Sequence, residues 1–286
     1  MEVRSVLPVG AILGEGPVWA RDVLWFVDIK RHRVHRFDPI SGESTHWTAP
    51  DQVGWVLPAI GGGMIAGVKT GVHRFTPETG EFTLLFDPEP GLPDNRLNDA
   101  AVDRHGRIWF GSMDDRESGE SGRLYRTHGS HCIDTGLPRV SITNGPAIAA
   151  DVRTLFHTDT LGKQIWRVPI HDDGSLGTPV SHVTIEPGAG HPDGSVIDAE
   201  GCLWVGLFGG WGVRRYDPDG ALMQTVAFPV ANVTKIAFGG PGLSTAYATT
   251  ASKGLDAAAR AAQPLAGNVF AFDPGVSGLA AHEAIL

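Results

Sequence analysis

The chain repeats one hydrophobic pattern six times. Short, continuously apolar runs begin at Leu24, Met64, Ile108, Leu155, Leu203 and Ala246, so successive starts lie 40 to 48 residues apart. Each run follows a turn signal, such as DRHG before Ile108 or DAEG before Leu203. A β-rich run without alternation is typical of a strand that is buried on both faces.

A second set of runs follows in the same phase, at residues 34–37, 72–75, 124–127, 165–168, 213–216 and 269–272. These runs alternate apolar with polar residues, which indicates half-buried strands, and several end in turn sequences such as DPISG or DPDG. More apolar runs precede the first set, so each repeat predicts four strands. The pattern predicts an all-β, six-bladed β-propeller formed by residues 1–286 as a single domain. We expect residues 3–9 to complete the last blade.

Composition and charge exclude several classes of protein. The 286 residues include 32 Asp and Glu against 23 Lys and Arg, with no basic cluster, which argues against binding to nucleic acid or to an anionic membrane. Two cysteines, Cys132 and Cys202, exclude a disulfide scaffold and a CxxC zinc motif. Neither a signal peptide nor an apolar run of membrane-spanning length is found. We therefore expect a cytoplasmic protein, and a monomer.

A polar residue lies about ten residues before the apolar run in five of the six repeats. These residues are Glu15, Asn98, Asn144, Asp193 and Lys235, whereas the second repeat has only Gly54 and Trp55 there. The innermost strands of a propeller line its central channel, so residues at their starts converge at one channel mouth.

Two carboxylates and two carboxamides brought together there would be unfavourable without a positive charge between them. Oxygen ligands suit Ca²⁺, Mg²⁺ or Mn²⁺. The motifs LGEGP, ITNGP and HPDGS each place a glycine after the polar residue, which leaves space at the mouth. The alternative is that each motif is an ordinary turn, but the common phase of the motifs favours a site.

Two long segments are predicted to overhang this mouth, residues 112–122 (SMDDRESGESG) and residues 250–267. Long loops on a rigid scaffold commonly carry binding function, so these two indicate a pocket for a polar small molecule. A solvated acidic loop is the alternative for residues 112–122.

Several motifs together resemble the senescence marker protein/regucalcin/gluconolactonase family. They are residues 13–19 (LGEGPVW), 96–99 (RLND), 106–113 (GRIWFGSM), 143–146 (TNGP), 193–194 (DG) with Leu203 and Trp204, and 238–241 (FGGP). The stretches LWFVDIK, HTDT and NVTK are most similar to bacterial sugar-lactonases of that family, such as xylonolactonases. The resemblance implies a six-bladed propeller with one divalent metal ion in its channel.

The same resemblance implies roles for individual residues. Glu15, Asn144 and Asp193 would be the metal ligands, and the metal would be Ca²⁺, Fe²⁺, Zn²⁺ or Mn²⁺. Arg96 and Glu117 would contact the substrate, with Glu117 preferred over Glu120 in the acidic loop, and Asn98 would contact the substrate or a metal-bound water.

The predicted function is metal-dependent hydrolysis of a sugar lactone, a pentono- or hexonolactone, to the aldonic acid. Asp193 is the candidate general base, and Lys235 could neutralise charge or be structural. The alternative is a non-enzymatic Ca²⁺-binding propeller that acts in interaction or buffering. A metal-dependent phosphotriesterase or aryl esterase would share the site chemistry but predicts apolar pocket walls. His157 and His191 are expected at strand ends, with His191 near the channel mouth.

Overall fold

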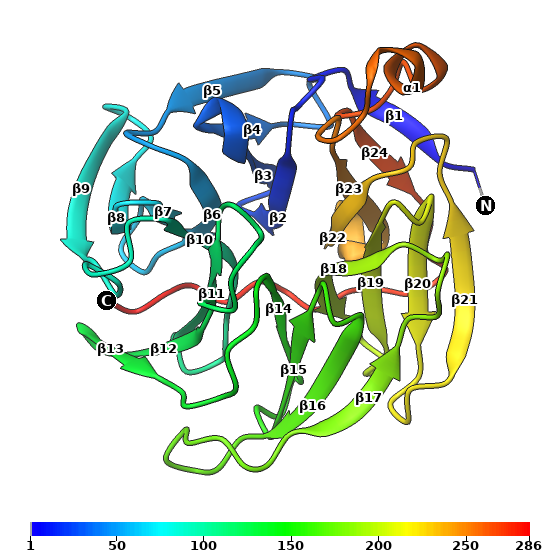
Figure 1. The fold of residues 1–286 in the computed structure, drawn as a ribbon. Coiled ribbons are helices and arrows are strands. Elements are labelled where there is room, and N and C mark those ends of the chain that lie inside the picture. The colour runs from blue at the N-terminus through cyan, green and yellow to red at the C-terminus, as the bar shows by residue number, and fades with distance from the viewer. Residues whose placement is uncertain (1) are drawn as a thin grey trace.

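Six four-stranded antiparallel sheets surround a central channel in the computed structural model, which describes residues 2–286 (Figure 1). The six-bladed β-propeller predicted from the repeat is confirmed. Met1, the first residue of the predicted domain, lies outside the described residues.

Each of the first three sheets is a meander whose innermost strand comes first in sequence. The first sheet contains β2 (Gly14–Ala20), β3 (Val23–Asp28), β4 (Arg33–Phe37) and β5 (Ser44–Thr48). The second contains β6 (Val53–Pro58), β7 (Met64–Val68), β8 (Gly71–Thr76) and β9 (Glu81–Phe86). The third contains β10 (Asn95–Val102), β11 (Ile108–Asp114), β12 (Leu124–His128) and β13 (His131–Asp134).

The remaining sheets continue the ring and close it. The fourth contains β14 (Thr143–Ile148), β15 (Thr154–Asp159), β16 (Gln164–Pro169) and β17 (Val180–Thr184). The fifth contains β18 (His191–Ile197), β19 (Leu203–Phe208), β20 (Gly212–Tyr216) and β21 (Leu222–Ala227). The sixth contains β22 (Val233–Gly239), β23 (Thr245–Thr250), β24 (Val269–Phe272) and β1 (Arg4–Leu7). Because β1 pairs with β24, the N-terminal strand completes the last blade as predicted.

The continuously apolar runs form the second strand of every sheet, and successive side chains in a run face opposite neighbours. In β3, Leu24 and Phe26 pack in a core cluster with Tyr247 of the sixth sheet. Trp25, between them, packs in another cluster with Phe75 of the second sheet. A strand that is buried on both faces in this way needs an apolar residue at every position, which explains the missing alternation.

The C-terminal segment crosses the channel, which the sequence did not predict (Figure 1). It forms isolated bridges from Gly278 to Asp198 and from Ala284 to Ala59. The Ile285 amide also donates to the Gly106 carbonyl at 2.9 Å. The chain end therefore connects the second, third and fifth sheets.

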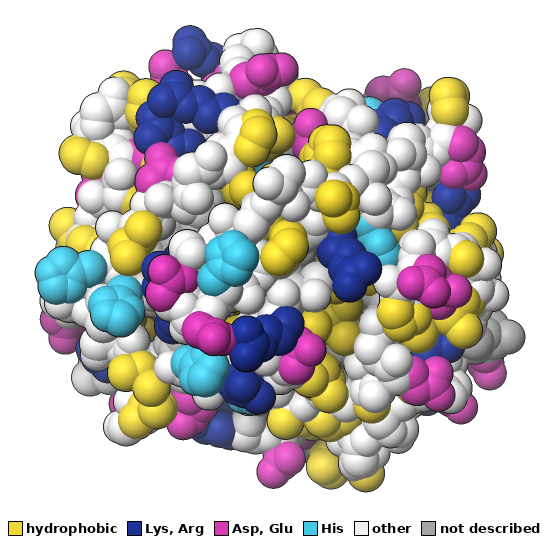
Figure 2. All heavy atoms as spheres, turned by 90° about the horizontal axis from the view of Figure 1, so that it is seen from below, with side chains coloured by type: hydrophobic (Ala, Val, Ile, Leu, Met, Phe, Trp, Pro, Cys, Tyr) yellow, Lys and Arg dark blue, Asp and Glu magenta, His cyan; other side chains and the backbone are white. Residues whose placement is uncertain are grey.

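A short helix, α1 (Ala257–Ala262), lies in the long connection between β23 and β24. The Asp256 side chain caps it by accepting a hydrogen bond from the Ala259 amide at 2.8 Å. Two single-turn 3-10 helices, Ile29–Arg31 and Pro241–Leu243, lie in other connections. Within residues 2–286 no helix is long and apolar enough to cross a bilayer. On one side of the molecule, Figure 2 shows acidic, basic and histidine side chains interspersed with apolar ones.

A buried aspartate in the fifth sheet provides a test of the blade architecture. The Asp198 carboxylate accepts hydrogen bonds from Trp204 Nε1 and Arg215 Nε, both at 2.8 Å, and its side chain is fully buried. Asp198→Ala leaves the guanidinium and the indole N–H without this acceptor, so we expect a loss of about 3 kcal/mol in the free energy of unfolding. Urea denaturation followed by circular dichroism measures it. Asp219→Ala, in an exposed turn of the same sheet, is the control. If Asp198→Ala lowers the free energy of unfolding no more than Asp219→Ala does, the buried hydrogen bonds of Asp198 do not stabilise the blade.

Candidate functional site

A cavity of about 210 Å³ lies where four innermost strands begin. Its lining is Leu13, Glu15, Arg96, Asn98, Met113, Glu117, Ile142, Asn144, Thr160, Leu161, His191, Asp193, Phe208 and Lys253. The lining contains every residue that the sequence analysis assigned to metal or substrate. Nine of these fourteen residues carry polar side chains and five are apolar.

Glu15 and Asp193 are the acidic centre of this cavity. They come from β2 in the first sheet and β18 in the fifth, two blades apart around the ring, and their carboxyl groups lie within hydrogen-bonding reach of each other. Burial, followed by the charge of Asp99, raises the pKa of Glu15 to about 7. Burial, followed by the charge of Glu15, raises the pKa of Asp193 well above its usual value. The two buried carboxyl groups therefore disfavour each other's ionisation.

The innermost strands are bulged where they carry these side chains. The register between β2 and β3 shifts between Glu15 and Val18, and the register between β14 and β15 shifts between Asn144 and Ala147. Gly16, which follows Glu15, has a φ of +55°, a conformation that glycine adopts without strain. Bulges are frequent next to active sites because they redirect a side chain.

A chain of hydrogen bonds fixes the amides beside the acidic pair. Asn98 Nδ2 donates to Asn144 Oδ1 at 2.9 Å and to the Thr143 carbonyl at 2.7 Å. Asn144 Nδ2 donates to Thr160 Oγ1 at 2.9 Å. These contacts fix which end of the Asn144 amide is the oxygen, and this Oδ1 lies in the lining of the same cavity as the two carboxyl groups.

Arg96 extends this chain to two residues that the sequence analysis missed. Its Nη1 donates to Asn98 Oδ1 at 2.6 Å, and its Nε donates to Asp115 Oδ1 at 2.9 Å. Lys30 Nζ donates to the same Asp115 oxygen at 2.7 Å. The Arg96 side chain is 2% exposed, so the cavity is bounded by a fixed, buried guanidinium.

Lys235 does not line this cavity, so the prediction that it shares the position of the other four polar residues is wrong, although its charge still acts on Glu15. In β22 the register shifts before Lys235, whereas in β2 it shifts after Glu15. The Lys235 ammonium donates to both carboxylate oxygens of Asp99, at 2.7 and 2.8 Å. A Cβ on Gly194 would lie 2.6 Å from the Lys235 side chain, so this glycine makes room for the buried pair. Asp99 was not among the predicted site residues.

The two long loops meet at the cavity as predicted. Glu117, in the connection between β11 and β12, pairs with Lys253 at the start of the connection between β23 and β24. Glu117 has a φ of +58°, and three backbone amides of its turn donate to the Asp114 side chain. Glu120 is exposed and does not line the cavity. Lys253 was not predicted, because loop length locates a loop but not its side chains.

The two candidate histidines differ. His191 lines the cavity, and its Nδ1 donates to the Thr160 carbonyl at 3.2 Å, as expected for a residue near the mouth. His157 is 3% exposed, and burial lowers its pKa to about 4, so it is a neutral packing residue.

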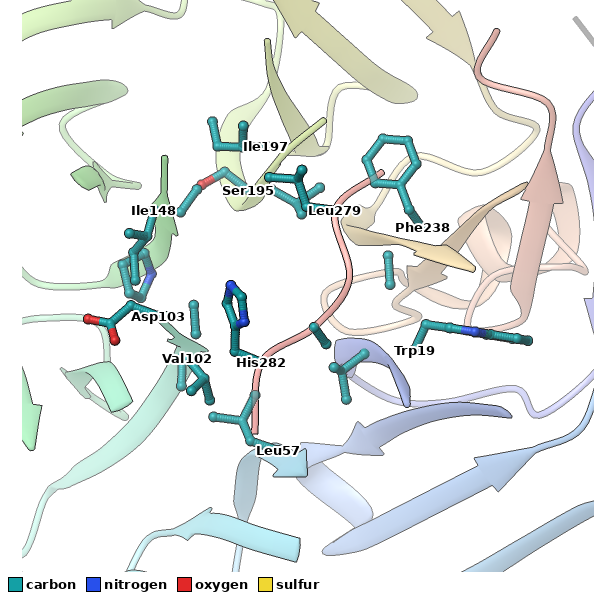
Figure 3. Close-up of a pocket in the computed structure, with 18 of the residues that line it drawn as sticks. Trp19, Leu57, Val102, Asp103, Ile148, Ser195, Ile197, Phe238, Leu279 and His282 are labelled. Carbon is teal, nitrogen blue, oxygen red and sulfur yellow. The ribbon is translucent and has the colours of Figure 1, made fainter. Parts of the chain in front are cut away.

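The other ends of the same innermost strands enclose a second cavity, of about 360 Å³. Figure 3 shows its mostly apolar lining, which includes Trp19, Leu57, Ile148, Ile197, Phe238 and Leu279. Its acidic residue, Asp103, already accepts hydrogen bonds from Trp109 Nε1 at 2.8 Å and from Arg107 Nε at 2.7 Å. The polar chemistry of the channel therefore lies at the Glu15 end.

The donor set at that end suits a divalent cation. A divalent cation between Glu15 and Asp193 would stabilise the ionised form of both buried carboxyl groups. The amide oxygen of Asn144 would supply a third oxygen ligand. Within residues 2–286 no group of three His, Cys, Asp or Glu side chains could hold a metal ion. The predicted site therefore depends on Asn144 as its third protein ligand.

Comparison with known proteins agrees with this architecture. Residues 13–252 match the profile of the SMP-30/Gluconolactonase/LRE-like region. The chain belongs to this family. The matched segment begins two residues before Glu15 and ends just before Lys253, so it contains all the predicted metal and substrate residues.

Relatives are similar over nearly their whole length. The chain is 32% identical to 6-deoxy-6-sulfogluconolactonase from Pseudomonas putida over 97% of both chains. It is 31% identical to regucalcin from Macaca fascicularis, covering 99% of this chain and 98% of the relative. Among solved structures it is similar to a calcium-binding protein, regucalcin, from Agrobacterium tumefaciens, with a TM-score of 0.93 and 27% identity over 99% and 97% of the two chains.

Proposed function

We propose that the protein is a sugar lactonase that uses one divalent metal ion to hydrolyse a pentono- or hexonolactone to the aldonic acid. The observation that carries this proposal is that the buried carboxyl groups of Glu15 and Asp193 lie together in the channel-mouth cavity of a gluconolactonase-family propeller. In this proposal Glu15, Asp193 and Asn144 hold the ion. A divalent ion held there supplies a Lewis acid for the ester carbonyl.

The residues of the chain supply the proton transfers and the orientation of the lactone. Asp193 accepts a proton from the attacking water as the water oxygen bonds to the carbonyl carbon. Arg96 Nη2 has no protein hydrogen-bond partner within residues 2–286. It is therefore assigned to the carbonyl oxygen, where negative charge develops. When the bond from the carbonyl carbon to the ring oxygen breaks, Asp193 returns the proton to that oxygen.

Asn98 receives a positioning role in this scheme instead of the contact with substrate or a metal-bound water implied by resemblance. Its Nδ2 already donates to Thr143 and Asn144, and its Oδ1 accepts from Arg96. Asn98 therefore fixes the Asn144 oxygen and the Arg96 guanidinium relative to each other. Glu117 remains the candidate for contact with substrate hydroxyl groups.

The direct experiment measures the pH drop during hydrolysis of aldono-1,4- and 1,5-lactones. The protein is first treated with a chelator and then supplied with Ca²⁺, Mn²⁺, Zn²⁺ or Fe²⁺. Metal-dependent turnover of at least one lactone supports the proposal. If no lactone is hydrolysed with any metal, while Ca²⁺ binds and raises the melting temperature, the non-enzymatic calcium-binding alternative replaces it.

Metal affinity should depend on pH because the ion competes with a proton. The raised pKa of Glu15, about 7, means that this carboxyl is protonated below that pH in the metal-free protein. Affinity for Ca²⁺ should therefore fall by about tenfold for each unit that the pH drops below about 7. Calorimetric titration with Ca²⁺ at about pH 6 and about pH 8, in buffers of different ionisation enthalpy, measures affinity and released protons together.

Equal affinity at the two pH values, with no proton released at the lower one, would contradict the raised pKa of Glu15. Asp219→Ala is a suitable control, because it removes an exposed carboxyl far from the cavity lining and should leave the pH dependence unchanged.

A further inference from the structure

Three cations lie at one side of the cavity, where two carboxylates form ion pairs with them. The cations are Lys30, Arg96 and Lys253, and the carboxylates are Asp115 and Glu117. Arg96 and Lys253 line the cavity itself. Lys30 does not line it, but donates to Asp115, which also accepts from Arg96. This excess of positive charge is unusual in a chain with a net charge of -9.

The excess arises because two cations share a single carboxylate oxygen. Arg96 Nε and Lys30 Nζ both donate to Asp115 Oδ1, at 2.9 and 2.7 Å. Burial, together with the nearby charges of Arg96 and Lys253, lowers the pKa of Lys30. All three cations therefore interact with one another, and one positive charge lacks a counter-charge in this group.

Lys253 is held at the cavity wall by its backbone. Its amide donates to the Ile12 carbonyl at 2.8 Å, and its carbonyl accepts from Asn232 Nδ2 at 3.0 Å. Its side chain is 32% exposed and pairs with Glu117, whose side chain is 35% exposed. Because the pair is accessible from the cavity, a ligand anion can replace Glu117 as the partner of Lys253.

The charge of the acidic pair does not offset this excess once an ion is bound. Glu15 and Asp193 together carry two negative charges, which a divalent ion balances. The remaining cavity then has a net charge of one positive unit, contributed by the groups around Asp115 and Glu117. A neutral polyol would leave that charge uncompensated, whereas an anionic substituent would neutralise it.

We infer that the cavity accepts a lactone that carries an anionic substituent, such as a carboxylate, sulfonate or phosphate, and that Lys253 is the specificity-determining residue. The inference rests on the proposed function and adds the substrate class. The ester lies near Asp193 and Arg96, and the substituent takes the place of the Glu117 carboxylate at the Lys253 ammonium.

Two lactones that differ in one group provide the test. D-glucaro-1,4-lactone has a carboxylate where D-glucono-1,4-lactone has a CH₂OH group, so the ratio of their kcat/KM values isolates the charge. We expect the wild-type protein to prefer the glucaro-lactone and Lys253→Met to lower that ratio by about tenfold. Glu117→Gln, which removes the competing carboxylate, should raise the ratio, and Lys253→Arg should largely retain it.

Lys163→Met is the matched control. Lys163 lies in the turn between β15 and β16, two residues from the cavity-lining Leu161, but does not itself line the cavity. Lys163→Met also removes one positive charge near the cavity, and it should leave the ratio of the two kcat/KM values unchanged. A ratio that moves equally in Lys163→Met and Lys253→Met would overturn the assignment, because the effect would then come from overall charge.

A second readout separates this inference from the proposed function. Calorimetric titration of the Ca²⁺-loaded protein with glucarate and with gluconate measures binding without turnover. If neither lactone is hydrolysed but glucarate binds more tightly in a Lys253-dependent way, the lactonase proposal fails and the anion site stands. If both lactones are hydrolysed with a ratio that neither Lys253→Met nor Glu117→Gln changes, the lactonase proposal stands and the anion site is overturned.

Discussion

Asp193→Ala should abolish metal binding and lactone hydrolysis together. Asp193 is one of only two carboxylates in the proposed donor set and is also the proposed base, so both roles are lost in one substitution. We expect Ca²⁺ affinity to fall by more than about 100-fold and kcat/KM to fall by about 10³-fold or more. Calorimetric titration and the lactone assay measure the two effects on the same preparation.

A stability measurement separates this result from unfolding. Burial raises the pKa of Asp193, so in the metal-free protein its ionisation costs stability at every pH above its unfolded value. Asp193→Asn removes that cost and keeps the side-chain volume. The metal-free Asn variant should therefore melt at or above the wild-type temperature at about pH 8. Full activity or undiminished Ca²⁺ affinity in Asp193→Ala would remove this residue from the site.

Arg96→Met should impair catalysis and leave the metal bound. The guanidinium is assigned to the developing oxyanion, and the loss of one such donor typically costs about 10² to 10³ in rate. The fold should tolerate the change because Asp115 retains Lys30, at 2.7 Å, and Gln52 Nε2, at 2.8 Å. We expect kcat/KM to fall by that amount while Ca²⁺ affinity changes by less than about threefold.

Arg167→Met is the control for this substitution, since Arg167 is exposed on β16 and does not line the cavity. If Arg96→Met lowers Ca²⁺ affinity as much as it lowers kcat/KM, Arg96 acts by holding Asn98 and Asn144 in place. Its assignment to the oxyanion would then be wrong.

The blades and much of the site could be predicted from the sequence because each repeat forms one blade. Residues at the same position in different repeats therefore lie at equivalent places in the propeller. Each apolar run became the second strand of a sheet, and the residues upstream of four runs, among them Glu15 and Asp193, meet at one mouth. Loop length predicted that the segment containing Glu117 lies at this mouth, whereas the choice of Glu117 within it came from the family resemblance. The positions of the four strand residues needed only the phase of each residue within its repeat.

The features that were not predicted depend on contacts that do not recur from one repeat to the next. Asp99 and Lys235 pair across 136 residues, and so do Glu117 and Lys253. Lys235 was misplaced because the register of β22 shifts before it, and the side of a bulge cannot be found from residue spacing. The channel-crossing C-terminal segment is held largely through backbone hydrogen bonds, such as that of Ala284 to the Pro58 carbonyl. Backbone hydrogen bonds can form with almost any side chain, so they leave no pattern in the sequence from which this crossing could be predicted.

In the proposed mechanism, lactone opening requires one divalent ion held by Glu15, Asn144 and Asp193. This requirement is tested by titrating chelator-treated protein with Mn²⁺ and recording the rate of aldonolactone hydrolysis at each addition. We expect no hydrolysis above the spontaneous rate without metal, and a rise that saturates at one ion per chain. Full hydrolysis before any metal is added, or no hydrolysis at saturation with Mn²⁺ or with any other divalent ion, would contradict it.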